Sequence, residues 1–470
     1  MSLSKTIYLT LSAVLILSLP FLANGLDWSV AWFLPMAALA AAALLALAAF
    51  SLRGAILLII FIMPAVTHFN YLKINIFSYL PFLNNYSFLF NPASLIYLLI
   101  ILFGAITIFE KRRDLKNLPL KYILLAASAY AAASIFRSAD RQTSLIELIY
   151  LLVPFSLYLI AYLYFSGEAW LTKLMLAAVF SSIIPLIAAA AQLLAGDYFY
   201  EPSSSLGRLT GGLDHPNTFG LFLFLIIALT LTGYLAKKKQ KIKDNKFLLF
   251  LLAGSLFFLA LSYSRTAWVA LAVFSALLIF IKRKAILLLL AALPAGAAAF
   301  LLSSNIRSRV LETFDSALFS SVTARINIWR VALSQIQLKP LTGHGVGQAE
   351  AVIEKAKTWR GGISLPHNDY LLQTLELGLI GLAIFLAYTL GVIYYAYKTF
   401  AALPNEPAAI RLYGRDFSLN FKIIAFGLLA VLLALLPATI FESTSQKIIL
   451  QIIIWPLLGS LFSLKKLQAA

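Results

Sequence analysis

A single histidine at the start of an apolar run carries the strongest chemical pattern in the sequence. The next two residues after His367 are Asn368 and Asp369, and either can cap the first turn of a helix. An imidazole at a membrane–water boundary can accept a proton near neutral pH, which would make His367 a general base. The alternative is a histidine that serves only in the capping turn. We expect Gly378 and Gly381, one helical turn apart, only to permit close helix packing.

Three arginines lie at the ends of apolar runs, on what we predict to be one side of the membrane. Arg265 lies in a tight turn between two runs, and Arg208 lies in a glycine-containing segment before another run. Arg325 begins a stretch that predicts an amphipathic helix, with Trp329 one turn further on. A guanidinium pairs with two phosphate oxygens and stays charged, so the set favours a phosphate site. The alternative for each is an interfacial arginine that reaches the headgroup region.

A glycine-rich turn spans residues 340–347. Gly343, Gly345 and Gly347 occupy alternate positions in it. We predict a flexible turn whose N–H groups can face an anion. No Lys-Ser or Lys-Thr pair follows the glycines, so the turn is not a nucleotide-binding P-loop. The segment Asp-His-Pro-Asn at 214–217 is interpreted as the start and cap of another helix.

Metal and cofactor chemistry has little support in the sequence. None of the four histidines has a carboxylate cluster or a zinc-protease spacing around it. The chain contains no cysteine, which excludes disulfides and thiolate metal sites. No Gly-x-Ser-x-Gly nucleophile elbow is present. We therefore predict neither a metal ion nor a cofactor.

The elements that must hold these residues are long apolar helices. Hydrophobic residues make up 61% of the 470 residues and charged residues 12%, whereas a soluble domain carries about 25% charge. Runs such as 285–302, 423–440 and 448–464 approach the roughly 20 residues with which a helix crosses a bilayer. They do not alternate apolar with polar residues as barrel strands do. We predict an all-α, polytopic membrane helix bundle of about 12–14 transmembrane helices.

The basic residues indicate how the chain is oriented. With the N-terminus inside and the spans alternating, 23 of the 37 Lys and Arg residues fall inside and 14 outside, eight of them within 303–366. An excess of basic residues in inner loops is the positive-inside pattern, and it explains most of the net charge of +18 without nucleic acid. Two outer segments, 198–215 and 303–366, are longer than helix connections require, so we look for function there.

Taken in order, these motifs resemble the O-antigen ligase and O-antigen polymerase superfamily. The matching positions are 211–217, 264–268 around Arg265, Arg325 with Trp329, 340–345, and His367-Asn368 followed after nine residues by Gly378-x-x-Gly381. The shared module covers 205–395 and includes the large outer loop 303–366. We expect transmembrane helices on either side of it, over 1–204 and 396–470. The resemblance implies a GT-C-like fold with a helical periplasmic loop.

The resemblance also implies an activity: a metal-independent, inverting glycosyltransferase of the bacterial inner membrane whose active site faces the periplasm. The donor would be a glycan on undecaprenyl diphosphate, and the acceptor would be a sugar hydroxyl on lipid A-core. His367 would be the base, and Arg265 and Arg325 would stabilise the leaving diphosphate. The remaining substrate-contacting residues would be Arg208, Asn368, Trp329, Gly343 and Gly345.

Several alternatives stay open. The superfamily also contains polysaccharide polymerases and protein O-oligosaccharyltransferases, which the motifs do not separate. A single large basic outer loop favours a ligase, because a polymerase must hold a second lipid-linked glycan. A transporter or flippase for an anionic lipid-linked solute would place ionisable residues near the bilayer midplane. The nearest candidates, Glu147, Glu376 and Glu442, are each close to a helix end.

Overall fold

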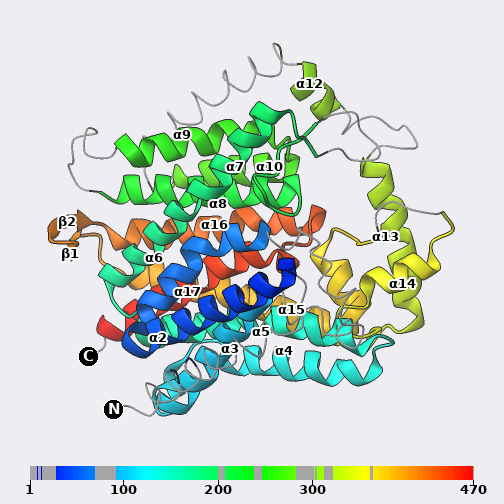
Figure 1. Ribbon diagram of the computed structural model, residues 1–470, viewed down its shortest axis with the longest axis horizontal. Helices are drawn as coiled ribbons and strands as arrows, with labels where there is room; N and C mark the ends of the chain where they lie inside the picture. The colour runs from blue at the N-terminus through cyan, green and yellow to red at the C-terminus, as the bar shows by residue number, and fades with distance from the viewer. Residues whose placement is uncertain are drawn as a thin grey trace.

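Long helices lie side by side and form a layered bundle (Figure 1). The computed structural model describes the chain at residues 8, 12, 28–68, 92–199, 207–237, 246–281, 301, 304–311, 321–359 and 364–468. Within these ranges one antiparallel hairpin is the only sheet, and the other regular elements are helical. The predicted all-α membrane bundle is confirmed.

The long elements of the bundle are apolar helices. They are α2 (Trp28–His68), α3 (Pro92–Glu110), α4 (Lys121–Ser134), α5 (Arg141–Tyr164), α6 (Glu168–Ser181), α7 (Ile183–Ala195), α8 (Pro216–Ala236), α9 (Lys246–Leu261), α10 (Arg265–Leu278), α15 (Asp369–Ala402), α16 (Phe421–Phe441) and α17 (Ile448–Gln468). The shorter elements are η3 (Asp114–Asn117), η4 (Ile135–Arg137), α12 (Ser304–Leu311), α13 (Ser321–Leu338), α14 (Ala349–Ala356), β1 (Ala408–Leu412), β2 (Arg415–Leu419) and η7 (Thr444–Gln446).

The number of spans is lower in the described part of the chain than the 12–14 predicted. Seven helical stretches there are long and apolar enough to cross a membrane, and three shorter apolar helices accompany them. One reason is that two predicted spans form the single helix α2, which is kinked at Ser51. Two further predicted spans, centred near residues 15 and 294, lie outside the described residues.

Helix α8 lies inside the bundle and sets the position of its own N-terminal residues. Every side chain from Leu221 to Leu229 is at most 1% exposed. A helix that is apolar on all faces belongs in the interior, where neighbours cover it on every side. Helices α9, α10 and α16 pack against it. The start of α8, with Asn217 in its first turn, is therefore fixed by packing.

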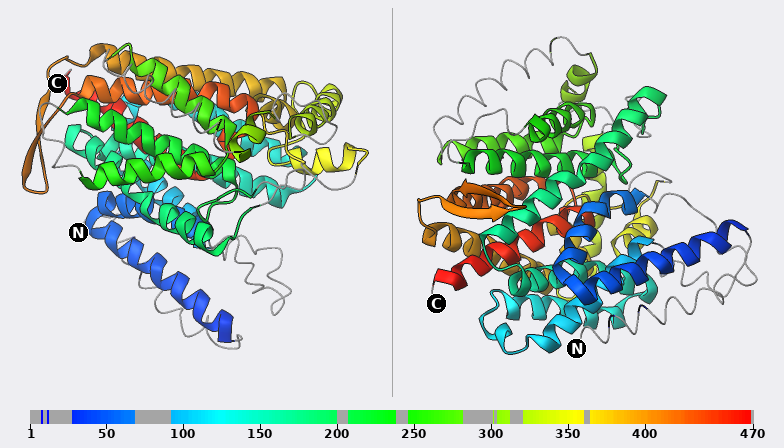
Figure 2. Two further views of the ribbon diagram at one scale, coloured as in Figure 1. Left: turned by 90° about the horizontal axis from the view of Figure 1, so that it is seen from above. Right: turned by 60° about the vertical axis from the view of Figure 1, so that its left-hand side comes forward.

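The two ends of the bundle carry different structures. Helices α13 and α14, which belong to the long loop expected over 303–366, project from one end, whereas the β1–β2 hairpin projects from the other (Figures 1 and 2). The hairpin, which joins α15 to α16, lies beside the far end of α8, where the Asn420 N–H donates to the Ala236 carbonyl at 2.9 Å. The helix starts that carry Asn217 and Asp369 lie at the end with α13 and α14.

Candidate active site

His367 contacts a buried carboxylate that lies 75 residues away in the sequence. Its Nδ1 is 2.9 Å from Oε1 of Glu442, the residue that follows the last turn of α16, and the Glu442 side chain is fully buried. His367 itself precedes α15 in a left-handed conformation with φ 45°. An ionised carboxylate only accepts hydrogen bonds, so Nδ1 carries the proton and donates it. The other ring nitrogen, Nε2, is then an acceptor, as a general base requires.

The charge of Glu442 is set by its neighbours. Burial alone would raise the pKa of this carboxyl, but Lys447, His367 and Arg325 together hold the pKa well below its usual range. Lys447 Nζ lies 3.6 Å from Glu442 and 3.6 Å from Asp214. Burial would lower the pKa of Lys447, and these two carboxylates raise it instead. Glu442 is thus an anion at neutral pH.

Asn217 and Arg208 hold Glu442 from the other side. Asn217 donates from Nδ2 to Glu442 Oε2 at 2.8 Å, and its Oδ1 accepts from Arg208 Nη2 at 2.7 Å. Arg208 Nε donates to the Ser262 carbonyl at 2.9 Å, and the whole residue is buried. We had expected Arg208 to contact a phosphate. In the structure the guanidinium is covered by protein and orients Asn217.

The other two arginines are more accessible. Arg265 is the half-buried first residue of α10 and follows the Ser262–Ser264 turn. This turn packs on the start of α8 so closely that a Cβ at Gly220 would lie 2.6 Å from Ser264 Cβ. Arg325, on α13, acts electrostatically on Glu442, and its buried Nε has no hydrogen-bond partner among the described residues. A buried guanidinium donor without a partner is available to a ligand.

Two other predicted site residues hold the loop that carries His367. Trp329 Nε1 donates to the Pro366 carbonyl at 2.7 Å, and its ring lies against Phe441, with 6.4 Å between the ring centroids. Asn368 is the N-cap of α15, and its side chain accepts from the Leu371 N–H at 3.0 Å. We had expected both to contact substrate. In the structure each has a positioning contact next to His367.

The glycine-rich turn packs closely against helix α15. The Gly343 N–H donates to the Lys339 carbonyl at 3.0 Å, and the Gly345 N–H donates to the Glu376 carbonyl at 2.7 Å. Gly343 has φ 67°, and a Cβ there would lie 2.3 Å from the Glu376 carbonyl oxygen. Gly378 has φ 70° and interrupts α15 at the same contact. In the structure these two N–H groups donate within the protein.

The sequence alone did not reveal Glu442, Lys447, Asp214 or Asn217 as members of the site. Glu442 and Lys447 flank the short connection between two apolar runs, and Asp214 and Asn217 flank the start of a third. Charged residues at the ends of spans are common, so the signal is weak without the packing of α8 against α16. Within the described ranges no three His, Asp or Glu residues are placed to hold a metal ion.

Comparison with known proteins identifies the segment around these residues. Residues 247–386 match a family described as O-antigen ligase. Over this segment the chain is similar to the O-antigen ligase family. The segment contains Arg265, Arg325 and His367, and it lies inside the module expected over 205–395.

The O-antigen ligase segment accounts for part of the site only, because Glu442 and Lys447 follow it in the chain and Asn217 precedes it. A protein of Rickettsia felis named "Putative polysaccharide ligase" is 33% identical over 93 residues. The alignment covers 18% of this chain and 23% of that relative, so the chain spans about a quarter of the relative's length.

Proposed function

We propose that this protein is a metal-independent, inverting membrane glycosyltransferase that transfers a glycan from undecaprenyl diphosphate to lipid A-core. The proposal rests on the contact between His367 and the buried anion Glu442, beside the unpaired Nε of Arg325. Such a transfer needs two groups. One is a base to remove the proton of the acceptor hydroxyl, and the other is a cation to stabilise the leaving diphosphate. The O-antigen ligase segment supports the same chemistry.

The proposed reaction is a single displacement at the anomeric carbon. The acceptor hydroxyl loses its proton to His367 Nε2 as its oxygen forms a bond to that carbon. The bond between the carbon and the diphosphate oxygen breaks, and its electron pair leaves with the diphosphate. Glu442 stabilises the imidazolium that forms, because its carboxylate already accepts the Nδ1–H. Attack from the face opposite the leaving group inverts the configuration.

The leaving diphosphate gathers negative charge, and Arg265 and Arg325 are the residues we assign to it. Fixed cations that face developing charge are among the largest contributions to catalysis. Arg208 takes no part in this binding, since it is fully buried and bonded to Asn217. Lys447 is held between two carboxylates, which leaves the arginines as the groups for phosphate.

We infer that the His367 end of the bundle faces the periplasm. Short basic segments gather at the opposite end, around η3 with Lys111 and Lys116 and in the β1–β2 hairpin with Arg411 and Arg415 (Figure 1). Tyr162, near the C-terminal end of α5, donates to the η3 Asn117 carbonyl at 2.8 Å. Basic residues in short loops mark the cytoplasmic side.

Transfer by purified protein tests the proposed reaction. Full-length protein in nanodiscs would receive a glycan on undecaprenyl diphosphate together with lipid A-core. We expect the glycan to appear on lipid A-core, with one undecaprenyl diphosphate released per transfer and an inverted linkage by NMR. Retention of configuration, or failure to transfer to any sugar acceptor, contradicts the proposal.

The lipopolysaccharide of a deletion strain separates ligase from polymerase. Without a ligase, lipid A-core carries no O-chain and polymer accumulates on undecaprenyl diphosphate. Without a polymerase, lipid A-core still receives one repeat unit. A gel band of core plus one unit in the deletion strain would therefore replace ligase by polymerase and leave the base and the arginines in their roles.

A further inference from the structure

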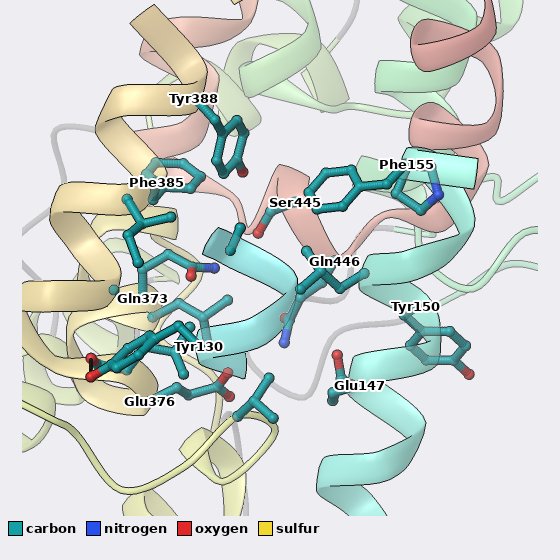
Figure 3. Close-up of a pocket in the computed structure, with 18 of the residues that line it drawn as sticks. Tyr130, Glu147, Tyr150, Phe155, Gln373, Glu376, Phe385, Tyr388, Ser445 and Gln446 are labelled. Carbon is teal, nitrogen blue, oxygen red and sulfur yellow. Dashed lines mark hydrogen bonds between the residues drawn. The ribbon is translucent and has the colours of Figure 1, made fainter. Parts of the chain in front are cut away.

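A polar pocket lies inside the bundle beside the start of α15. It is lined from α4, α5, α15, η7 and α17 and encloses about 840 Å³, including the part open to solvent. Figure 3 shows Glu147 on α5 across from Glu376 on α15, with Gln446 and Gln373 between the two helices.

Three carboxylate or amide side chains in this pocket have no hydrogen-bond partner among the residues that the structure describes. Glu147, Gln373 and Gln446 form no side-chain hydrogen bond or ion pair with any residue that the structure describes, and each is half-buried. The other carboxylate and the other amide of the lining are engaged. Glu376 accepts from the Ala349 N–H at the start of α14, at 3.2 Å, and Gln451 accepts from the Trp455 indole. Polar groups held in a membrane bundle without partners indicate a polar ligand.

The lining restricts what that ligand can be. It contains two acidic side chains and no Lys, Arg or His, so no group in the lining attracts an anion such as a diphosphate. An acyl chain would leave the carboxylate and the amides without hydrogen bonds, which is unfavourable in an apolar surrounding. Sugar hydroxyls donate to carboxylates and bond with amides, and sugar rings lie on aromatic side chains. Tyr150, Tyr388 and Trp455 supply such rings.

The pocket is joined to His367 through one short segment, residues 442–447. Glu442 and Lys447 in this segment face His367 and Asp214, whereas Ser445 and Gln446 line the pocket. The segment is fixed by the buried carboxylate of Asp369, which accepts from Thr444 Oγ1 at 2.7 Å and from the Ser445 N–H at 3.2 Å. The segment therefore links the lining of the pocket to the carboxylate that holds the base.

We propose that this pocket is the acceptor subsite and binds the sugar whose hydroxyl His367 deprotonates, or the sugar next to it. The proposal rests on the proposed glycosyl transfer, and it adds Glu147, Gln373 and Gln446 as the residues that determine which acceptor is used. A carboxyl oxygen of Glu147 accepts hydrogen bonds from sugar hydroxyls. The side-chain amides of Gln373 and Gln446 both donate hydrogen bonds to these hydroxyls and accept hydrogen bonds from them.

The test compares pocket variants with a matched control in the full-length protein. Glu147→Gln and Gln446→Ala change the pocket, and Glu350→Gln removes an exposed carboxylate of α14 outside it. Transfer is measured against lipid A-core concentration at saturating donor. We expect KM for the acceptor to rise roughly tenfold or more in each pocket variant, the size of one lost hydrogen bond to a charged or polar group. KM for the donor stays unchanged, and the control behaves as wild type.

A binding measurement without donor keeps the pocket separate from the catalytic proposal. Core oligosaccharide freed from its lipid is the probe, and saturation-transfer NMR reports its binding to wild type and variants. Weaker binding in Glu147→Gln and Gln446→Ala supports the subsite even if no transfer to lipid A-core is ever observed. Unchanged oligosaccharide binding and unchanged acceptor KM in both variants overturn the proposal. It is also overturned if both variants lose binding to lipid A that lacks the core oligosaccharide. Gln373→Ala replaces any variant that fails to fold.

Discussion

Two regions next to the segment 442–447 differ in charge. On the side of α8, α10 and α13 lie the guanidinium groups of Arg265 and Arg325, and Nε of Arg325 lacks a partner among the described residues. On the side of α4, α5 and α15 lies a pocket with Glu147, Glu376 and amide side chains but no basic residue (Figure 3). One side suits an anion, and the other suits an uncharged, hydroxyl-rich molecule.

This difference has a geometric consequence for the proposed reaction. An inverting displacement requires the attacking hydroxyl and the leaving diphosphate to lie on opposite sides of the reacting carbon. The arginines attract the diphosphate of the donor, whereas the pocket without basic residues suits the sugar of the acceptor. Donor and acceptor therefore approach the reacting carbon from different directions. Holding two reactants in this way contributes to the rate through their orientation.

His367 is the proposed base, so His367→Ala should have the largest effect. Loss of a general base costs about 10²–10⁴ in rate, and we expect this loss with donor and acceptor KM nearly unchanged. Transfer by purified protein is the measurement. His344→Ala is the control, because that ring has its one hydrogen bond among the described residues with the Gln335 carbonyl, at 3.1 Å. Near-normal transfer by His367→Ala would reduce His367 to a residue of the capping turn.

Arg265→Ala and Arg325→Ala should each slow transfer by about 10²–10³, the cost of removing one group that stabilises developing charge. Lys at either position should restore little, because a planar fork on a diphosphate is poorly replaced by a point charge. Arg330→Ala, an exposed residue of the same helix as Arg325, is the control. Acceptor KM should not change. Full rescue by Lys at both positions would mean that net charge alone matters there.

Glu442→Gln should slow transfer by about 10–100-fold, the size of one lost hydrogen bond between charged groups. The variant should also lose stability at neutral pH, because the pKa of Glu442 is held well below its usual range in the folded protein. Glu406→Gln, exposed at the other end of the bundle, is the control. A variant with wild-type activity would show that His367 needs no orienting carboxylate.

The pH dependence of this stability has a definite sign. A folded-state pKa below the unfolded value of about 4.3 stabilises the protein fully above that value. The stabilisation is lost as pH falls from there towards the folded-state pKa of Glu442. The difference in thermal unfolding temperature between wild type and Glu442→Gln should thus be largest near pH 7 and shrink below about pH 4.3. A difference that grows on acidification would contradict the charge assigned to Glu442.

The sequence predicted local features of the site better than its long-range contacts. The pattern at His367-Asn368 predicted a helix start, and Asn368 caps α15 in the structure. The pairing with Glu442 could not be predicted, because it depends on which ends of α15 and α16 meet. Apolar periodicity indicates that two helices exist but not which of their faces pack together. The pocket between Glu147 and Glu376 was missed for the same reason.

Two expectations about the site show what a local motif leaves undetermined. Arg208 and the glycines at 343 and 345 have residue types that suit phosphate binding, yet the structure uses all three internally. A guanidinium donates equally well to a phosphate or to an amide oxygen, as it does to Asn217. A left-handed glycine serves an anion-binding turn or a close contact between backbones. Burial decides between these uses, and burial is a property of the fold.

Removal of divalent metal should have the smallest effect, with no loss of activity. The arginine side already supplies cations for the leaving diphosphate, and within the described ranges no three His, Asp or Glu residues are placed to hold an ion. Of the two acids that line the pocket, Glu376 already accepts a hydrogen bond from the Ala349 N–H at the start of α14.

The measurement is transfer by purified protein in excess EDTA, with donor and acceptor freed of metal beforehand. Because a diphosphate can itself carry Mg²⁺, the comparison must include Arg325→Ala. If arginine alone stabilises the leaving group, this variant stays slow with or without Mg²⁺. Activity lost on chelation and regained with Mg²⁺ or Mn²⁺ would place a metal ion on the α10 side and remove the charge contrast between the two regions next to the segment 442–447.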